Sequence, residues 1–221
     1  MENYQLELKG EQESQIGCRS FLYSLLSRGF RFPRPELYES VKGGKLADEV
    51  QVALANLPHN GLKGGLGRGL GLSYEEFQSN YIGLFEVGGD NGTPCPLYEG
   101  EYGGGRMKVL EEVLRFYHHF GLRISPENRE RPDHLSTELE FMHLLTFKET
   151  EAVIQGKENN AYLRAESDFL RFHLGDLVGA VAQRAGAKAV PFYQDLVSLA
   201  DSFCRNELAY LLPTGKGGQN G

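Results

Sequence analysis

The sequence predicts an all-α protein, a single globular multi-helix domain over residues 1–212 with long loops and a disordered tail, 213–221. Apolar residues recur at spacings of three and four along most of the chain, the pattern of amphipathic helices. Sustained period-two alternation is missing, and Asn91-Gly92 lies inside a glycine-rich loop rather than between β-branched runs. No repeat of about 20 to 50 residues is found, which argues against a helical solenoid.

The first predicted helix covers residues 15–30, where five apolar residues form one stripe: Cys18, Phe21, Leu22, Leu25 and Leu26. Pro33 and Pro35 then interrupt the chain before a weaker helical stretch over 36–57. Residues 58–71 contain six glycines, whose backbone entropy disfavours helix and strand, so we expect a mobile loop there.

Ser73 and Glu76 form a predicted capping box, which opens a helix with an apolar face made of Tyr74, Phe77, Tyr81, Leu84 and Phe85. Residues 88–105 are rich in turn formers and predict a long loop. A helix follows over 106–120, and Gly121 stands where a left-handed C-cap is expected.

Pro132 is expected at the first position of the next helix, where its missing N–H costs nothing, with Asp133 in the first turn. This helix should continue to Ile154. Two more are predicted over 160–184 and 190–212, with inward-facing apolar side chains Phe169, Phe172, Leu177, Val181, Leu196, Leu199 and Phe203.

Composition limits the classes of function. The chain has 221 residues, of which 40% are hydrophobic, enough for a sizeable core. With 23 Lys and Arg against 30 Asp and Glu, the net charge of -7 disfavours nucleic acid and favours basic partners. Three widely spaced cysteines, the lack of a secretory signal and the lack of a long apolar run predict a cytoplasmic protein without membrane insertion.

The segment Glu130-Arg131-Pro132-Asp133-His134 carries the densest group of polar residues, and Glu138, Glu140 and His143 follow it. Glu140 and His143 make a Glu-x-x-His half-motif, but di-iron bundles need this motif twice. We therefore predict no metal and no cofactor. A helical-bundle metalloprotein using His134, Glu138, Glu140 and His143 is the alternative.

Each residue of this segment also has an ordinary structural explanation. Asp133 fits a helix N-terminus, and His134 fits a partly buried histidine bonded to a carbonyl group. The density of polar groups at one loop-to-helix junction instead favours a site that grips a polypeptide.

Motifs for catalysis are missing from the sequence. There is no Gly-x-Ser-x-Gly elbow, no His-Glu-x-x-His, and no phosphate-binding Gly-x-x-x-x-Gly-Lys-[Ser/Thr], since Gly215-Lys216 is followed by Gly217. Cys95 has no neighbouring base in the local sequence, but the absence of these motifs leaves a catalytic nucleophile open.

Four segments resemble the TorD/DmsD/NarJ family of molybdoenzyme maturation chaperones. They are Tyr81-Ile82-Gly83-Leu84-Phe85, Pro96-Leu97-Tyr98-Glu99, the segment 130–134 with its continuation to Met142, and Phe169-Leu170-Arg171-Phe172-His173-Leu174. The resemblance covers roughly residues 73–184.

The resemblance implies a TorD-like helical fold and a cytoplasmic chaperone that is not an enzyme. Such a chaperone binds the twin-arginine signal or N-terminal region of the catalytic subunit of a molybdopterin-dependent oxidoreductase of the DMSO reductase superfamily. It assists folding and molybdenum cofactor insertion before export or assembly. The oligomeric state stays open. The residues that the resemblance places at the client-binding surface are Tyr81, Phe85, Tyr98, Glu130, Pro132, Asp133, His134 and Glu138.

Overall fold

The computed structural model describes residues 6–59, 62, 65–67, 70–88, 92–123, 130–185 and 189–212. Every named element within these residues is helical, which confirms the all-α prediction. The tail 213–221 and much of the predicted glycine loop lie outside the described residues. The α-helices are α1 Glu11–Gly29, α2 Pro35–Lys42, α3 Lys45–Ala55, α4 Tyr74–Tyr81, α5 Arg106–His119, α6 Leu135–Ile154, α7 Asn160–Phe169, α8 Gly175–Ala185 and α9 Pro191–Leu211. Two π-helical turns, η1 Ile82–Glu86 and η3 Leu170–Leu174, and a 3-10 turn, η2 Glu99–Glu101, complete them.

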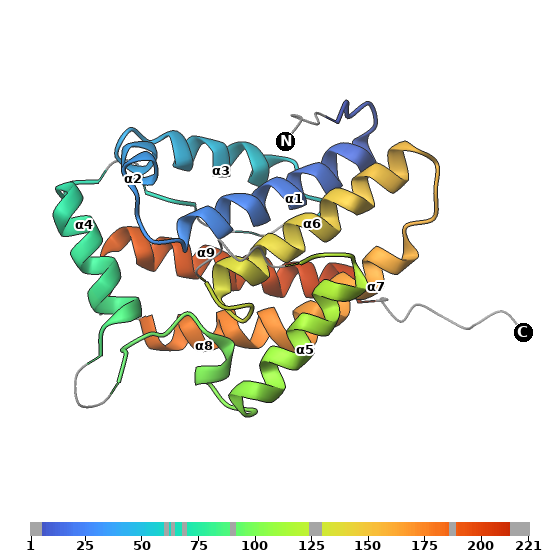
Figure 1. Ribbon diagram of the computed structural model, residues 1–221. Helices are drawn as coiled ribbons and strands as arrows, with labels where there is room; N and C mark the ends of the chain where they lie inside the picture. Colours follow the sequence, from blue (N-terminus) through green and yellow to red (C-terminus); the bar gives the residue numbers. More distant parts are fainter. Residues whose placement is uncertain are drawn as a thin grey trace, which may run out of the picture.

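Helices α1 and α6 lie side by side in the middle of the molecule, with α3 above α1 and with α8 and α9 packed against each other below (Figure 1). Ser27 Oγ donates a hydrogen bond of 2.8 Å to the Ser136 carbonyl across the α1–α6 contact. At the end of α1, a Cβ added to Gly29 would lie 2.8 Å from Leu196 Cδ1, so a larger residue there would require the Leu196 side chain on α9 to move. One continuous group of buried apolar residues reaches from Leu22 to Cys204.

A buried ion network joins four helices. The Arg19 guanidinium on α1 is fully buried and donates to Glu149 on α6 at 2.9 Å, to Glu166 on α7 at 2.5 Å and to both carboxylate oxygens of Glu207 on α9. His59 Nε2 lies 2.7 Å from Glu207. Burial raises the pKa of Glu166 to about 8, although Arg19 opposes the shift, whereas Arg19 and His59 hold the pKa of Glu207 below its usual value. One carboxyl of the network is therefore protonated at neutral pH.

Two predicted helix boundaries in the first part of the chain are wrong. Helix α1 begins at Glu11 rather than Gln15, because the Glu13 side chain accepts a hydrogen bond of 3.1 Å from the N–H of Gly10 and closes the first turn. The stretch predicted as one helix over 36–57 is two helices, since Gly44 adopts a left-handed conformation with φ +78° between them.

Local capping predictions are confirmed. Ser73 Oγ accepts from the N–H of Glu76 at 3.2 Å, and the Glu76 carboxylate accepts from the N–H of Ser73 at 2.7 Å. Gly121 has φ +74° after α5, where a left-handed residue was expected.

Two other predictions fail for tertiary reasons. Pro132 is not the first residue of α6 and Asp133 is not in its first turn, because the helix begins at Leu135 with His134 as N-cap. Phe172 does not face inward but is 56% exposed, since the π-helical turn η3 adds one residue and shifts the register of the apolar stripe.

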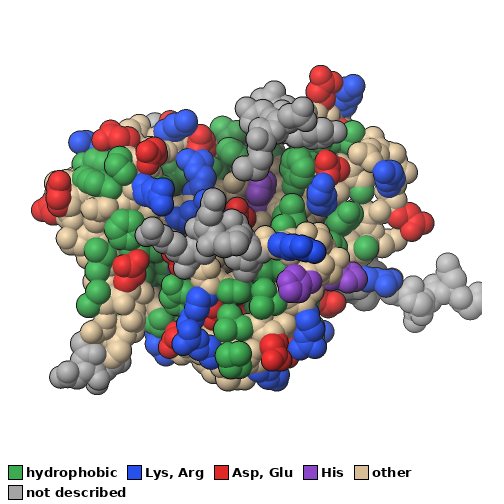
Figure 2. Space-filling model, viewed as in Figure 1, with side chains coloured by type: hydrophobic (Ala, Val, Ile, Leu, Met, Phe, Trp, Pro, Cys, Tyr) green, Lys and Arg blue, Asp and Glu red, His purple; other side chains and the backbone are tan. Residues whose placement is uncertain are grey.

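The described helices include none that combines the length and the apolar character needed to cross a membrane. On the face seen in Figure 2, Lys and Arg side chains gather over the part where α1 ends and where α2 and α3 lie, with acidic side chains among them.

Candidate functional site

The segment 130–134 is held against the loop that precedes η2. Tyr98 and His134 form an isolated antiparallel bridge, in which the N–H of Glu99 donates to the Asp133 carbonyl at 2.9 Å and the N–H of Leu135 donates to the Leu97 carbonyl at 2.7 Å. These two bonds occupy the backbone of Asp133 and Leu135 and determine where α6 begins.

The Asp133 carboxylate fixes the same contact from inside. Its side chain is fully buried, and it accepts from the N–H of Gly100 at 3.1 Å and from Arg131 Nε at 3.0 Å. Because a buried carboxylate must be paired, Asp133 ties the loop to α6 and also orients the Arg131 guanidinium.

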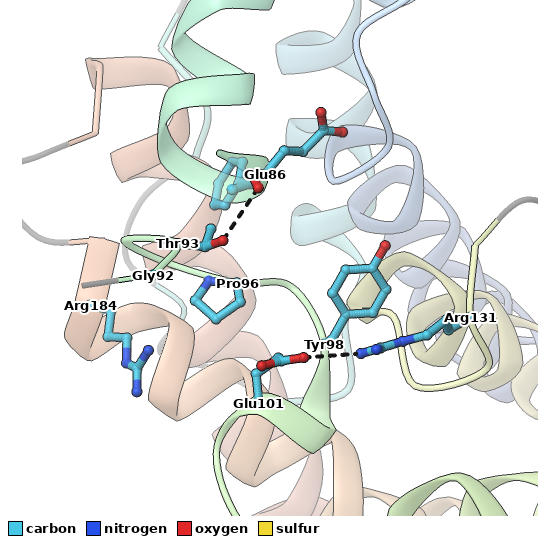
Figure 3. A pocket seen from close by; sticks show the side chains of 9 residues that line it. Glu86, Gly92, Thr93, Pro96, Tyr98, Glu101, Arg131 and Arg184 are labelled. Carbon is cyan, nitrogen blue, oxygen red and sulfur yellow. Dashed lines mark hydrogen bonds and ion pairs between the residues drawn. The ribbon is translucent and has the colours of Figure 1, made fainter. Parts of the chain in front are cut away.

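Tyr98 lies at the centre of the site (Figure 3). Arg131 stacks its guanidinium over the Tyr98 ring, 4.0 Å from the centroid, and also pairs with Glu101 at 3.7 Å. The Tyr98 hydroxyl donates to Glu130 Oε2 at 3.0 Å. Burial and the negative charge of Glu130 raise the pKa of Tyr98 to about 12, so the phenol stays protonated and keeps this hydrogen bond.

His134 is buried beneath Tyr98 and caps α6. Its Nδ1 accepts from the N–H of Ser136 at 3.2 Å, so the neutral ring carries its proton on Nε2, which lies 3.8 Å from Glu130 Oε2. Burial lowers the pKa of His134 to about 4, more strongly than the charge of Glu130 raises it. The ring is therefore neutral at pH 7.

Glu138 is fully buried one turn further along α6. Burial, followed by the charge of Glu99, raises the pKa of Glu138 well above its usual value. Glu99 in turn lies 3.1 Å from Nδ1 of His173 on η3. Glu99 therefore connects the loop to η3.

Two adjoining cavities form what we call the signature groove. One of about 580 Å³ lies between η1, the 92–101 loop and α8, and one of about 1090 Å³ lies between the end of α1, the start of α2 and the start of α6. Both are lined by Glu86, and the hydrogen bond from Tyr98 to Glu130 joins their walls. Further lining residues are Phe85, Thr93, Pro96, Glu101, Arg131 and Arg184 in the first cavity, and Arg28, Arg31, Phe32, Arg34 and Glu140 in the second.

The signature groove carries a pair of like charges. Partial burial and the negative charge of Glu130 raise the pKa of Glu86, and no described residue forms a hydrogen bond or ion pair with the Glu86 carboxylate. In Figure 3 this carboxylate points away from Thr93, on the same side as the Tyr98 hydroxyl. A cationic group bound between Glu86 and Glu130 would relieve their repulsion and could lie against the Tyr98 ring.

Comparisons with known proteins agree with this architecture. The sequence model of the nitrate reductase delta subunit family matches residues 45–183. The chain belongs to this family. It is 34% identical to the perchlorate reductase assembly chaperone protein of Dechloromonas aromatica (strain RCB), over 88% of this chain and 90% of the relative.

Two further relatives are more similar over shorter stretches. The selenate reductase assembly chaperone protein of Thauera selenatis is 43% identical over 47% of this chain and 54% of the relative. The chlorate reductase assembly chaperone protein of Ideonella dechloratans is 38% identical over 56% of this chain and 64% of the relative. The predicted membership in the TorD/NarJ family of redox enzyme maturation proteins is confirmed, and the chain is a maturation chaperone rather than an enzyme.

The residues that the family resemblance assigned to client binding divide into two groups. Phe85, Tyr98 and Glu130 line the signature groove. The others lie behind it: Tyr81 is buried and donates from its hydroxyl to the Phe30 carbonyl, the Pro132 carbonyl accepts from Tyr117, and Asp133, His134 and Glu138 are buried. Contact with a client stays a prediction for all eight.

The signature groove also contains Glu86, Arg131 and Arg184, which are not among the client-binding residues predicted from the sequence. Arg131 lies inside the family segment, and Glu86 directly follows the Leu84-Phe85 pair, so the family motifs marked their neighbourhood. Arg184 carried no such signal, because only the fold brings α8 to the 92–101 loop.

The metalloprotein alternative finds no support in the described part of the chain, where no three His, Cys, Asp or Glu side chains converge on a metal position. His143 Nδ1 instead contacts Ser20 Oγ at 2.9 Å on α1. Glu140 pairs with Arg31 at 2.7 Å. Two of the four candidate ligands are thus engaged away from His134 and Glu138.

Proposed function

We propose that this maturation chaperone binds the twin-arginine signal or N-terminal region of the catalytic subunit of a molybdopterin-dependent oxidoreductase in the signature groove. The relatives are assembly chaperones of perchlorate, selenate and chlorate reductases, which supports a related client. Binding in the cytoplasm would hold the client until molybdenum cofactor insertion, before export or assembly.

The observation that carries the proposal is the like-charged pair Glu86 and Glu130, of which Glu130 accepts a hydrogen bond from Tyr98. A twin-arginine segment supplies two adjacent guanidinium groups, which pair with carboxylates in bidentate geometry and stack on aromatic rings. Phe32, which is 37% exposed, offers apolar surface in the second cavity for the apolar part of a signal. The arrangement therefore complements both halves of such a peptide.

The test is fluorescence anisotropy with a synthetic labelled peptide that carries an Arg-Arg pair followed by an apolar stretch, and with the matched Lys-Lys peptide. Glu86→Gln and Glu130→Gln keep the size of the side chain and one hydrogen-bond-accepting oxygen but remove the charge. Each exposed ion pair contributes about 0.2–1 kcal/mol, so the double variant should bind about two- to thirtyfold more weakly. Glu75→Gln, on the exposed side of α4, removes the same charge elsewhere and should bind as the wild type does.

Unchanged affinity in the double variant, or equal affinity for the two peptides, would refute the assignment of the signature groove. A co-purification of tagged protein from its native host identifies the client independently, by mass spectrometry. Recovery of a molybdenum-enzyme catalytic subunit with the wild type, and weaker recovery with Glu86→Gln/Glu130→Gln, is the expected result.

A further inference from the structure

A second groove lies between α5 and α7 and shares no lining residue with the signature groove. It has a volume of about 480 Å³ and an apolar floor. Phe116 of α5 and Phe120, the C-cap of α5, form one wall, and Ala161 and Ala165 of α7 form the other. Because both alanines are small and lie one turn apart, a third helix could approach this wall closely.

The floor is anchored in the hydrophobic core. The Phe116 ring lies 5.2 Å from that of Phe169 in an edge-to-face arrangement, and the Phe120 ring lies 6.1 Å from that of Phe141. Phe169 and Phe141 are themselves buried. The groove is therefore part of the packed structure and does not need a rearrangement of the core to exist.

The rim of this groove is basic although the chain as a whole is acidic. Arg115, His119 and Arg164 are exposed on the rim, and Asp168 is the acidic residue of the lining. Arg115 Nε donates to the Glu111 carbonyl at 3.4 Å, and no described carboxylate forms an ion pair with Arg115 or Arg164. Figure 2 shows histidine and basic side chains together where α5 ends and α7 begins.

We propose that the α5–α7 groove docks an acidic amphipathic helix of a partner protein. Apolar side chains at spacings of three and four would enter between Phe116 and the two alanines, and flanking Asp or Glu residues would pair with Arg115 and Arg164. This partner chemistry is opposite to that of the signature groove, where the carboxylates select a cationic segment. The inference does not depend on which client the signature groove binds.

The probe is a labelled designed helical peptide with leucines at spacings of three and four, flanked by glutamates. A second peptide replaces the glutamates by lysines, and a third has the same composition in scrambled order. Anisotropy at low salt should show binding of the acidic amphipathic peptide alone. Arg115→Gln/Arg164→Gln should weaken it about two- to thirtyfold, the range expected for two exposed ion pairs.

The matched control Lys45→Gln/Arg205→Gln removes two exposed charges on α3 and α9 and should leave binding unchanged. Ala161→Glu, at an exposed position of the groove wall, should abolish binding by filling the groove with a negative charge. Circular dichroism confirms that each variant is folded, and unaltered binding of the Arg-Arg peptide separates this groove from the signature groove. Failure of the acidic peptide to bind, equal binding of the lysine peptide, or insensitivity to the arginine substitutions would overturn the proposal.

Discussion

Replacing Arg19 by methionine is expected to destabilise the protein by about 3–5 kcal/mol, the cost of removing one partner of a buried ion network. The guanidinium makes four hydrogen bonds to three carboxyl groups that are themselves buried. Methionine fills a similar volume but leaves the ionised Glu207 and its neighbours without a counter-charge other than His59. Domains of this size have a free energy of unfolding of about 5–15 kcal/mol, so the variant should be close to its folding threshold.

The loss of stability in Arg19→Met should depend on pH, since the carboxylates that no longer pair with Arg19 can bind protons instead. Each pH unit changes the free energy of protonating such a group by about 1.4 kcal/mol. Urea denaturation followed by far-UV circular dichroism, at pH 5 and at pH 7, should therefore give a smaller loss at pH 5. Arg205→Met is the matched control, because Arg205 is 74% exposed and pairs with Asp201 at the surface, and it should cost less than about 1 kcal/mol.

A loss below about 1 kcal/mol for Arg19→Met at pH 7 would show that the network contributes little to stability. A loss that is equal at the two pH values would show that unpaired carboxylates are not its cause.

Three other predictions concern single groups. The folded pKa of Glu166, about 8, exceeds the usual glutamate pKa of 4.5, so this proton's contribution to stability is complete below about pH 4.5 and is lost as pH rises through 8; Glu166→Gln should remove this fall in urea titrations at pH 6 to 9. The pKa of His134, about 4, lies below 6.5, so wild-type stability should fall as pH falls from 6.5 through 4. His134→Asn, which keeps an N-cap acceptor, should flatten the profile there, and an unchanged slope would contradict the assignment. Ser73→Ala should cost about 1 kcal/mol in thermal unfolding because the Glu76 N–H loses its acceptor, while Ser79→Ala, on the exposed face of α4, should be nearly neutral.

Features that depend on neighbours in sequence could be predicted. The capping box of Ser73 and Glu76 and the left-handed Gly121 are determined within one turn of chain, so their residue types and spacing suffice. The all-α class follows from periodicity that the packing of α1 on α6 then satisfies. The family motifs also assign Tyr98 and Glu130 to one site, and in the structure these two side chains are joined by a hydrogen bond.

Features that depend on distant residues could not be predicted. The start of α6 is predicted too early because Pro132 satisfies the local rule for a first helical residue. In the structure Pro132 and Asp133 form a turn, and the bridge to Tyr98 holds His134 extended as the N-cap. Arg19 interrupts an apolar stripe without any local sign that three glutamates from α6, α7 and α9 surround it. The like-charged pair of Glu86 and Glu130 also arises only in the folded chain.

The segment 130–134 therefore contains both partly exposed residues that can contact a client and buried residues that hold the groove in shape. Variants of the two kinds must be interpreted differently. Glu130 has a side chain that is 33% exposed, so Glu130→Gln tests charge at the surface of the groove. Asp133 is fully buried and holds both the Gly100 N–H and Arg131. Asp133→Ala would release the loop and the guanidinium over Tyr98, so a loss of binding in that variant reports the position of Tyr98 rather than a contact with the client. Only variants that keep the hydrogen bonds of Asp133 to Gly100 and Arg131 can distinguish a lost contact with the client from a change in the structure of the groove.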